Sequence, residues 1–548
     1  MAWDSAFQSI AIPPIKIRNA EETVEINGYR DIKLYHPGLQ NLGCEPGNYW
    51  LDQQFCWKAQ KSRTSRGECE IELTNGNVQS AFCKITHILD PIRWVKNRYE
   101  LSPLAAHRKS WRRAQAKLND PMNQAYVEAV TYYCVSKLRE MDISPHFPYS
   151  YGSFSAVAEN YRFNITDEFD SYKNTRWFWK ARDRNAFRLV IESDDTPSEK
   201  EEWTRRPSFI DDTTSDSSSE STDDSGSNSS DESLAVDAMD EKEGSIRTAD
   251  DLSFKSHSSE EISEEESEDN TDELEPKFFI ELQNIPVMMM FLERNDGVMD
   301  ELLEDPDLVG AEPGTSAWDT IWSAWIFQVI AGLCVAQATL SLTHNDLHTN
   351  NIVWAATDKK YLYYSTRDGT RWKVPTYGKI FRIIDFGRAI LRIGDRLVYS
   401  DDFRSGNDAA TQYNFGPLHS ARGPVVTPNP SFDLTRLAVS LFENLFPEEP
   451  KPKTDGDLLS KEEGLEVLET KSELYNILWK WMLTRSGENV LITPDGDEKY
   501  PSFDLYTVIA AECEGARPRD QVHAKPFSEF IMGRAAIPKS EKVYSLFF

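Results

Sequence analysis

The sequence contains few cysteines, and none of them is spaced as a paired metal or redox ligand. The chain of 548 residues holds seven cysteines, an odd number, and no CxxC motif. Their scatter argues against a metal site built on paired thiolates and favours a reduced, intracellular setting. The N-terminus also lacks a basic stretch followed by an apolar run, so we expect no secretory signal. The cysteines are Cys44, Cys56, Cys69, Cys83, Cys134, Cys334 and Cys513.

Basic residues are also scarce. Lys and Arg number 60 against 90 Asp and Glu, which gives a formal net charge of -30. Most of this charge lies between Glu192 and Glu275, where about 30 acidic and 6 basic residues leave about -24. The remainder is only mildly acidic, and its charge gives no support to nucleic-acid binding. The tract has too few apolar residues to offset the entropy of ordering it, so we predict a disordered insert over residues 192–276.

Long apolar runs are absent except for one that has the length of a membrane span. Residues 321–342 include no charged residue, and their length is near the ~20 residues that a spanning helix needs. Polar residues are spread along the run, however, and it leads directly into a polar cluster at His344–Asn351. We therefore predict a buried helix and no membrane association, although length alone leaves a membrane span open.

Hydrophobic patterning divides the chain into a β-rich part and a helical part. Residues 1–48 show no clear period and are interpreted as an N-terminal extension. Residues 49–290 contain β-type runs and one long helical pattern, and residues 291–548 are mainly helical, so we predict an α+β fold. Strands are expected at Tyr49–Lys58, Glu68–Leu73, Ala81–Ile85, within Tyr149–Ile191 and at Pro286–Leu292, and a hairpin between Asn351 and Asp385. Helices are expected at Gln124–Met141, Ser316–Leu342, Ser431–Phe446, Glu462–Thr484 with a possible break, and Phe503–Glu512.

Two short polar motifs follow these elements in order. His344–Asn351 reads HNDLHTNN directly after the long apolar helix, and Ile383–Gly387 reads IIDFG directly after the predicted hairpin. Together they resemble the protein-kinase catalytic loop, of HxDxxxxN form, and the DFG motif. The order of the two motifs, each at an element boundary, makes the resemblance specific. It implies a two-lobed protein-kinase-like fold, with a first lobe at 49–290 and a second at 291–548, that uses ATP and Mg²⁺.

The residue types in these motifs suit phosphoryl transfer. This reaction needs the γ-phosphate, its metal ions and the attacking hydroxyl to be held in line. By the resemblance, Asp346 orients the hydroxyl and accepts its proton, while Asn351 and Asp385 hold Mg²⁺ against the phosphates. His344 completes the predicted catalytic set, and the resemblance gives it a role in bracing the loop. The alternative is that these residues only form turns, which Asp and Asn favour.

The resemblance also indicates residues that would hold the nucleotide. Lys84, in the sequence AFCK, matches the strand lysine that contacts the α- and β-phosphates. Glu128, in the helix that follows, is the predicted partner of its ammonium, which an apolar strand would otherwise bury unpaired. Phe291, Leu292 and Glu293 are predicted to form the hinge beside adenine. The alternatives are a solubilising edge-strand lysine at position 84 and a solvated helix residue at position 128.

Several features depart from the protein-kinase pattern. No GxGxxG precedes Lys84, and the nearest candidate for a phosphate-covering loop is Lys61–Gly67. Asn345 stands where an arginine is usual, so we predict that activity does not depend on activation-loop phosphorylation. His348 stands where serine/threonine kinases have lysine, and the resulting HxDLHxxN form resembles aminoglycoside and choline kinases. No APE motif follows the DFG, although Asp433 resembles the aspartate that anchors the catalytic loop.

The sequence therefore predicts a serine/threonine kinase that transfers the γ-phosphate of ATP to protein hydroxyls. A small-molecule kinase of the same fold stays open because of His348, and a pseudokinase scaffold stays open because of the missing glycine loop. Longer stretches resemble the serine/threonine kinases of large nucleocytoplasmic DNA viruses (giant viruses), which implies a location in the host cytoplasm or the virion. These stretches are Lys84–Ile85, Leu89–Ile92, Tyr149–Phe154, Val374–Phe381 and Ile384–Ala389.

The predicted insert contains candidate regulatory sites. Several of its serines have an acidic residue three positions later, the spacing that acidophilic kinases read through basic pockets. We therefore predict phosphorylation of the insert by host kinases of this class. The alternative is a solvated spacer without regulation, because a Ser/Glu-rich tract produces such spacings by chance. The serines are Ser217, Ser221, Ser229, Ser258 and Ser263.

Overall fold

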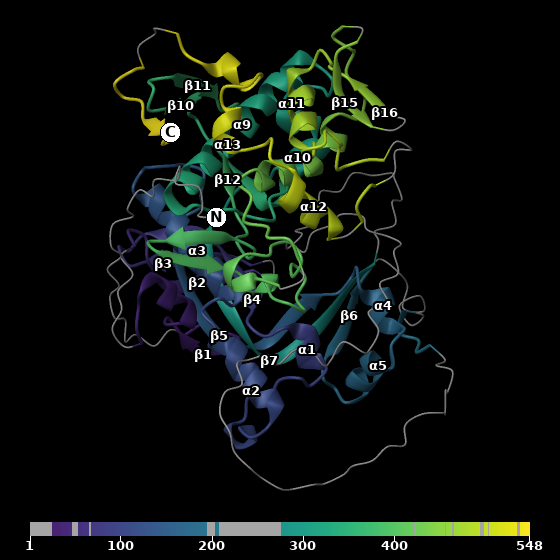
Figure 1. Cartoon of the computed structure of the whole chain (residues 1–548). Helices are drawn as coiled ribbons and strands as arrows, with labels where there is room; N and C mark the ends of the chain where they lie inside the picture. The colour runs from purple at the N-terminus through teal and green to yellow at the C-terminus, as the bar shows by residue number, and fades with distance from the viewer. Residues whose placement is uncertain are drawn as a thin grey trace.

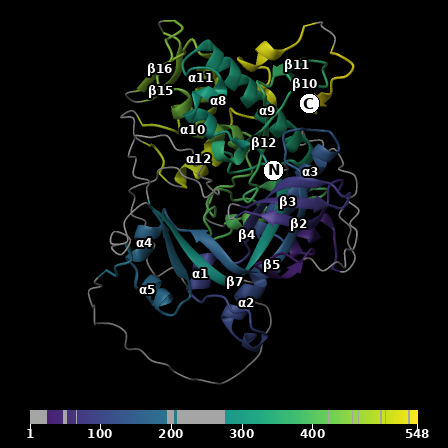
Figure 2. The same cartoon turned by 180° about the vertical axis from the view of Figure 1, so that it is seen from behind.

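The computed structural model describes residues 25–46, 53–64, 67–193, 203–207, 276–420, 423–454, 456–462, 465–493, 498–501, 503–533 and 537–548. A large sheet occupies one half of the molecule and the longer helices of the second part of the chain occupy the other (Figure 1, Figure 2). The predicted α+β class is confirmed. Most of the predicted insert, including the five candidate serines, lies outside the described residues.

The sheet is a curled antiparallel array of seven strands (Figure 1). Its main path runs β1-β5-β7-β4-β3-β2, and β6 pairs with β7 off this path. The strand β7 is long enough to pair with β6 along its first half and with β4 along its second half. The strands are β1 (Tyr29–Lys33), β2 (Trp57–Arg63), β3 (Glu68–Leu73), β4 (Val78–His87), β5 (Ser150–Asn164), β6 (Arg188–Glu192) and β7 (Lys277–Glu293).

The hairpin β3–β4 carries Lys84 into the middle of this sheet. Its turn has Gly76 in the left-handed region, with φ of 85°, and the side chain of Asn75 accepts a hydrogen bond from the backbone N–H of Asn77. In the pairing of β4 with β7, Lys84 lies opposite Met290. Alternate strand residues face opposite sides, so Cys83 joins the apolar core on one face while Lys84 faces the helical part.

The helix α3 (Gln124–Glu140) packs against β5 and β7. It begins after Asn123, whose side chain accepts a hydrogen bond from the backbone N–H of Ala125 at 3.0 Å. The 3₁₀ turn η1 (Pro37–Leu42) covers another side of the helix, which is why α3 is buried along nearly its whole length. Glu128 therefore lies inside the protein, with 1% of its surface exposed.

The helix α9 (Ser316–Leu340) is the core of the helical part. It begins after Thr315, whose hydroxyl accepts a hydrogen bond from the backbone N–H of Trp318 at 3.2 Å. By length and composition this helix could cross a membrane, but 94% of its apolar window is buried inside the protein. Trp318, Trp322 and Trp325 are each fully buried along it. The helix is a buried core helix, as predicted.

A strand pair after α9 brings the two polar motifs together. The strand β9 (Ile352–Ala356) pairs antiparallel with β12 (Lys379–Ile383), with Ile352 opposite Ile383. Asn351 directly precedes β9, and Asp385 follows the end of β12. Antiparallel pairing places these two ends side by side, so Asn351 and Asp385 come together although 33 residues lie between them in the sequence.

The remaining elements lie outside the large sheet, α3, α9 and the strand pair β9–β12. The helices are α1 (Pro91–Val95), α2 (Lys109–Leu118), α4 (Phe169–Lys173), α5 (Arg176–Asp183), α7 (Glu301–Glu304), α8 (Pro306–Val309), α10 (Phe432–Leu445), α11 (Glu473–Trp481), α12 (Asp504–Glu512) and α13 (Pro518–Gln521). The strands are β8 (Gly297–Val298), β10 (Tyr361–Ser365), β11 (Arg371–Pro375), β13 (Ile390–Ile393), β14 (Arg396–Tyr399), β15 (Leu458–Glu462), β16 (Leu465–Leu468) and β17 (Val543–Ser545). The 3₁₀ turns are η2 (Pro103–Ala105), η3 (Thr349–Asn351), η4 (Asp401–Phe403), η5 (Gly416–Leu418) and η6 (Phe527–Phe530).

Two predicted segments have a different secondary structure. Within Tyr149–Ile191, where strands were expected, α4 and α5 separate β5 from β6. Aromatic residues there favour strands by propensity, but Phe178 and Trp179 are buried by packing as helix residues, and this tertiary packing overrides propensity. Within Glu462–Thr484, where a helix was expected, the hairpin β15–β16 precedes α11. The helix α11 starts only after Ser472, whose hydroxyl accepts from the backbone N–H of Tyr475.

Two stretches outside the predicted core elements also join the sheet. Residues 29–33, within the predicted N-terminal extension, form the edge strand β1 and pair with β5. Near the start of the predicted insert, Glu192 ends β6, and Trp203 packs edge-on against Phe278 of β7 with ring centroids 5.4 Å apart. Residues 192, 193 and 203–207 of the predicted insert are therefore among the described residues.

Candidate active site

A cleft of about 2740 Å³ lies between the sheet and the helical part. Ligand sites in proteins are about 300–1,000 Å³, so this cleft has room for a nucleotide and for part of a second substrate. It is lined from one side by β4 and α3 and from the other by the segments that follow α9 and β12. The predicted site residues that line it are Lys84, Glu128, Leu292, Glu293, Asp346, Asn351 and Asp385.

Lys84 lies at the centre of an ion network on the sheet side of the cleft. Its ammonium Nζ is 2.7 Å from Oε1 of Glu128 and 2.9 Å from Oδ2 of Asp385. Burial alone would lower the pKa of Lys84, but Asp385 and Glu128 hold it well above its usual value. Burial raises the pKa of Glu128 and the lysine opposes that rise. Lys84 is therefore a fixed cation that links the sheet, α3 and the segment after β12.

The backbone of the catalytic-type loop is held from below by Asp433, the first acidic residue of α10. The backbone N–H groups of His344 and Asn345 donate to its carboxylate at 2.9 to 3.1 Å. Asn345 has φ of 65°, a left-handed conformation that asparagine tolerates better than most residues. Its amide donates to the backbone carbonyls of Thr343 and Arg388, and the hydroxyl of Tyr413 donates to its side-chain oxygen. The asparagine thus ties this loop to the segment after Asp385.

Asp346 faces the cleft from this loop as an ionised carboxylate. The hydroxyl of Tyr506 donates to its Oδ1 at 2.7 Å, and Nη1 of Arg388 lies 3.5 Å from the same oxygen. Burial would raise the pKa of Asp346, but Arg388, Tyr506 and the nearby Arg436 outweigh that effect and hold it well below its usual range. The carboxylate can therefore accept a proton or a hydrogen bond from a hydroxyl in the cleft.

Asn351 presents a free side-chain oxygen. Its amide Nδ2 donates to the carbonyl oxygen of Asp346 at 2.8 Å and to Nε2 of His348 at 2.9 Å. Burial lowers the pKa of His348 to about 4, so this ring is neutral and its Nε2 can accept. These two acceptors fix the amide, and Oδ1 of Asn351 is buried without a hydrogen-bond partner among the described residues. A buried, unpaired oxygen of this kind fits a ligand for a hard cation.

Asp385 supplies the second candidate oxygen ligand. Its backbone has φ of 63°, and its N–H donates to the hydroxyl of Tyr132 at 2.8 Å. A left-handed aspartate held by such a contact is a local strain of the type found at functional sites. No group of three or more His, Cys, Asp or Glu side chains within the described ranges could hold a metal ion. Asn351 and Asp385 therefore fit a magnesium ion only if phosphate oxygens and water complete its coordination.

His344 has a bracing position behind the loop. Its side chain is fully buried, and Nε2 donates to the carbonyl oxygen of Ile384 at 2.7 Å. Its ring also packs against Phe386, with centroids 5.2 Å apart. His344 was included in the predicted catalytic set, but it does not line the cleft. It holds the backbone before Asp385 in place, as the family resemblance also implies.

The predicted hinge residues have three different positions. Phe291 lies within β7, and its side chain faces the core beside Trp57 and is not among the residues that line the cleft. Leu292 faces the opposite side and lines the cleft. Glu293 ends β7 and forms ion pairs with Arg139 and Arg382. Neighbouring strand residues face opposite sides of a sheet, so the side chains of Phe291 and Leu292 point in opposite directions. An unbroken apolar sequence does not reveal which of them faces which side.

Three residues that contact Asp346 or Asp385 were not predicted from the sequence. Tyr506 and Arg388 contact Asp346, and Tyr132 holds the backbone of Asp385. Arg388 follows the DFG-like motif directly, so its place in the sequence could have indicated a role in the site. Tyr132 and Tyr506 lie in helices far from both motifs, and no local pattern distinguishes them from core aromatics.

The candidate phosphate-covering loop is described only in part. Residues 65 and 66 lie outside the described ranges. Gly67 has φ of 91°, and a Cβ there would meet the ring of Phe82 at 3.0 Å, so this position favours glycine. Arg63 and Gly67 both line the cleft, which places the hairpin β2–β3 over its sheet side.

Comparisons with known proteins give a short match to one kind of enzyme. No protein-family model matches the chain. Over 76 residues, 14% of this chain, the sequence is 36% identical to serine/threonine-protein kinase haspin from Bos taurus, and equally to haspin from Mus musculus. The match spans 10% of the length of each relative. The chain is thus similar over this segment to a serine/threonine kinase, which supports a protein-kinase-like relationship.

Proposed function

We propose that this chain is an ATP- and Mg²⁺-dependent serine/threonine protein kinase with a two-lobed kinase-like fold. The observation that carries the proposal is the meeting, in one cleft, of a fixed ammonium with two oxygens suited to a metal. Lys84 lies 2.9 Å from Asp385, and Asn351 presents a buried oxygen without a partner in the described part of the chain. The short similarity to haspin supports the same class of reaction.

Each residue has a role that follows from its geometry. Lys84 binds the α- and β-phosphates and is positioned for this by Glu128. Bound Mg²⁺ would neutralise charge on the phosphates, held by Asn351 and Asp385. Asp346 orients the acceptor hydroxyl and takes its proton, because its carboxylate stays ionised at neutral pH. Leu292 packs beside the adenine ring.

A small-molecule acceptor is the second candidate, and His348 favours it. The histidine stands where serine/threonine kinases have a lysine, and its low pKa leaves that position neutral. Transfer from radiolabelled ATP should be measured with a generic protein substrate and with a panel of small alcohols, including an aminoglycoside and choline. Label on serine or threonine of the protein supports the proposal, and label only on a small alcohol supports the second candidate. ATP binding without any transfer would identify a pseudokinase scaffold.

A location in the host cytoplasm or virion, and phosphorylation of the acidic insert by host kinases, are also part of the proposal. They rest on the resemblance to giant-virus kinases and on the serine spacings in the sequence. Mass spectrometry of the chain after incubation with an acidophilic kinase tests the second point directly. Unmodified Ser217, Ser221, Ser229, Ser258 and Ser263 would refute it.

Replacement of residues 208–275 by a short Gly/Ser linker should leave folding and basal activity nearly unchanged. Loop closure costs only about 0.6 kcal/mol for each doubling of loop length, so shortening this connection changes the free energy of unfolding little. Thermal unfolding and phosphate transfer of the shortened chain check the prediction. A collapse of either property would mean that the acidic insert packs against the rest of the protein.

Tyr506→Phe is expected to move the acidic limb of the kcat/KM profile to higher pH. The hydroxyl donates to Asp346 and helps to hold the pKa of that carboxyl low, so its loss raises the pKa. The ionised form is then lost at a higher pH as the solution is acidified. The matched control is Tyr377→Phe, because Tyr377 is an exposed tyrosine outside the cleft. An acidic limb that coincides for the parent and Tyr506→Phe would contradict the role of this contact.

A further inference from the structure

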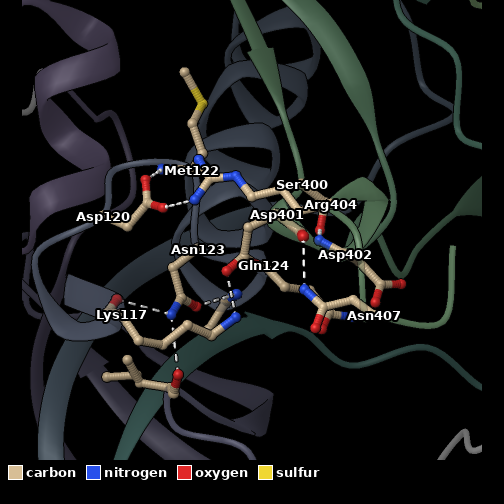
Figure 3. Close-up of polar contacts among 12 residues, drawn as sticks. Lys117, Asp120, Met122, Asn123, Gln124, Ser400, Asp401, Asp402, Arg404 and Asn407 are labelled. Carbon is tan, nitrogen blue, oxygen red and sulfur yellow. Dashed lines mark hydrogen bonds and ion pairs between the residues drawn. The ribbon is translucent and has the colours of Figure 1, made fainter. Parts of the chain in front are cut away.

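Two adjacent carboxylates lie where the chain after β14 crosses the start of α3 (Figure 3). Asp401 and Asp402 belong to the 3₁₀ turn η4, which begins after Ser400. Their side chains are 4% and 12% exposed, so both negative charges are largely removed from water. Buried carboxylates need cations or N–H donors, and the two side chains find them on different sides of the cleft.

Asp401 holds the start of α3. Its carboxylate forms an ion pair with Lys117 of α2 and accepts the backbone N–H of Gln124 at 2.9 Å. Its own backbone N–H donates to the carbonyl of Met122 at 2.7 Å, and Asn407 donates to its carbonyl at 2.8 Å. Figure 3 shows these contacts converging on Asp401 from both segments. The turn η4 and the segment at the start of α3 therefore each donate a backbone hydrogen bond to the other.

A second ion pair joins the same two segments. Arg404 pairs with Asp120, whose other carboxylate oxygen accepts the backbone N–H of Met122 at 2.9 Å (Figure 3). The negative charge of Asp401 also lies at the N-terminus of a 17-residue helix, where the helix dipole favours it. These contacts restrict the position of α3 relative to the turn.

The position of α3 decides the position of Lys84. Gln124 is the first residue of α3, and Glu128 lies about one turn later on the same side of the helix. Glu128 in turn holds the ammonium of Lys84 at 2.7 Å. A shift of the helix start would therefore move the carboxylate that positions the lysine.

Asp402 acts on the other side of the cleft. Its Oδ2 lies 3.1 Å from Nε of Arg388, and Nη1 of the same arginine lies 3.5 Å from Asp346. The carbonyl of Arg388 accepts the side-chain amide of Asn345, so both ends of this arginine are fixed. The cation beside Asp346 thus comes from residue 388, since residue 345 supplies none.

We propose that Asp401 and Asp402 are positioning residues that hold the site assembled without phosphorylation of the segment after Gly387. The inference rests on the proposed kinase function. A phosphate group adds a charge of about -1.5 to -2 and orders a loop by pairing with cations. The two carboxylates supply a comparable permanent charge and pair with Lys117 and Arg388. Asp401 sets α3 and the Lys84–Glu128 pair, and Asp402 sets Arg388 beside Asp346.

The test measures whether Asp401 acts through Glu128. Asp401→Asn should lower kcat about 10- to 100-fold, the cost of a small misplacement of a catalytic group, with a smaller change in the KM for ATP. Lys117→Met should have a similar effect. In a Glu128→Gln background, the further loss caused by Asp401→Asn should shrink to about twofold, because the two residues share one effect. Losses that multiply in the double variant would overturn the inference.

Two variants separate this result from general destabilisation, and a phosphatase treatment tests whether the site depends on phosphorylation. Asp142→Asn removes the ion pair of an exposed aspartate with Lys542 beyond the other end of α3, and it should leave kcat unchanged. Asp401→Glu keeps the charge and should recover part of the kcat lost in Asp401→Asn. Phosphatase treatment of the parent should leave its rate unchanged, and a large drop that rephosphorylation restores would overturn the inference.

Asp402→Asn tests the second carboxylate through Arg388. It should lower kcat by about tenfold or more, and Arg388→Met should make the same loss without adding to it in the double variant. Additive losses would overturn this half of the inference.

Amide hydrogen exchange across residues 124–132 is measured without ATP on three proteins, the parent, Asp401→Asn and Asp142→Asn. Faster exchange in Asp401→Asn but not in Asp142→Asn supports the positioning role even if the parent transfers no phosphate, and equal exchange in all three overturns it.

Discussion

Asp346→Asn is expected to lower phosphate transfer about 10²- to 10⁴-fold, the range for loss of a group that handles a proton in the transition state. The substitution keeps the size of the side chain and its acceptor for the hydroxyl of Tyr506. It removes the negative charge and the ability to take a proton. Single-turnover transfer from radiolabelled ATP, at saturating nucleotide, checks the prediction.

The matched control for this variant is Glu443→Gln. Glu443 is exposed and also lines the cleft, but none of the hydrogen bonds or ion pairs described for the reaction's residues involves it. Thermal unfolding of both variants should stay close to that of the parent. Turnover by Asp346→Asn equal to that of the parent would remove Asp346 from the reaction, and an equal loss in both variants would point to general damage to the cleft.

Asp385→Asn is expected to remove most of the benefit that Mg²⁺ gives to ATP binding and to lower transfer about 10²-fold or more, since a bound metal contributes several kcal/mol of charge stabilisation. The carboxylate is the only charged member of the proposed ligand pair, and it also lies 2.9 Å from Lys84. Titration calorimetry with and without Mg²⁺ measures the effect. Binding of ATP without metal should be retained, because the repulsion between Asp385 and the phosphates is gone.

Asn351→Ala provides the comparison for Asp385→Asn. It removes a neutral oxygen ligand, so the Mg²⁺-dependent gain in affinity should fall by less than in Asp385→Asn. It also releases the neutral ring of His348, which the amide contacts at 2.9 Å. An unchanged Mg²⁺ gain in both variants would mean that the metal, if it binds, uses other residues.

Local signals predicted the elements that carry the motifs. Asn123 and Thr315 each accept a backbone hydrogen bond at a helix start, and the helices begin at Gln124 and Ser316, as predicted. The HNDLHTNN and IIDFG motifs lie at element ends because a buried helix and a strand pair stop there. Asp433 contacts the backbone of the loop at the position that its resemblance indicated. Short-range patterns of this kind are determined by nearby residues.

Contacts across long sequence separations could not be predicted in the same way. Tyr506 donates to Asp346 across 160 residues, and Lys117 pairs with Asp401 across 284 residues. The faces of β7 were equally hidden, because Met288–Leu292 is apolar throughout and its two sides are distinguished only by register. These features depend on how the sheet and the helices pack, and a single sequence carries no local record of that packing.

Asn345 shows how a departure from a motif can be compensated. Its presence predicted a site without the usual cation beside the catalytic aspartate. In the structure, Arg388 occupies that place and Asn345 holds its backbone. The sequence could have predicted this cation, since Arg388 directly follows the second motif. It could not have predicted that the guanidinium points toward Asp346, because this orientation depends on Asp402.

We expect the cleft that contains Lys84, Asp346, Asn351 and Asp385 to transfer phosphate. The most direct test is the rate at which the purified parent chain transfers label from γ-labelled ATP to protein serine or threonine as Mg²⁺ is titrated against EDTA. The rate should rise and saturate with Mg²⁺, fall to background with excess EDTA, and be about 10²- to 10⁴-fold lower in Asp346→Asn. No transfer at any Mg²⁺ concentration, or a rate that is equal in the parent and Asp346→Asn, would contradict the proposed function.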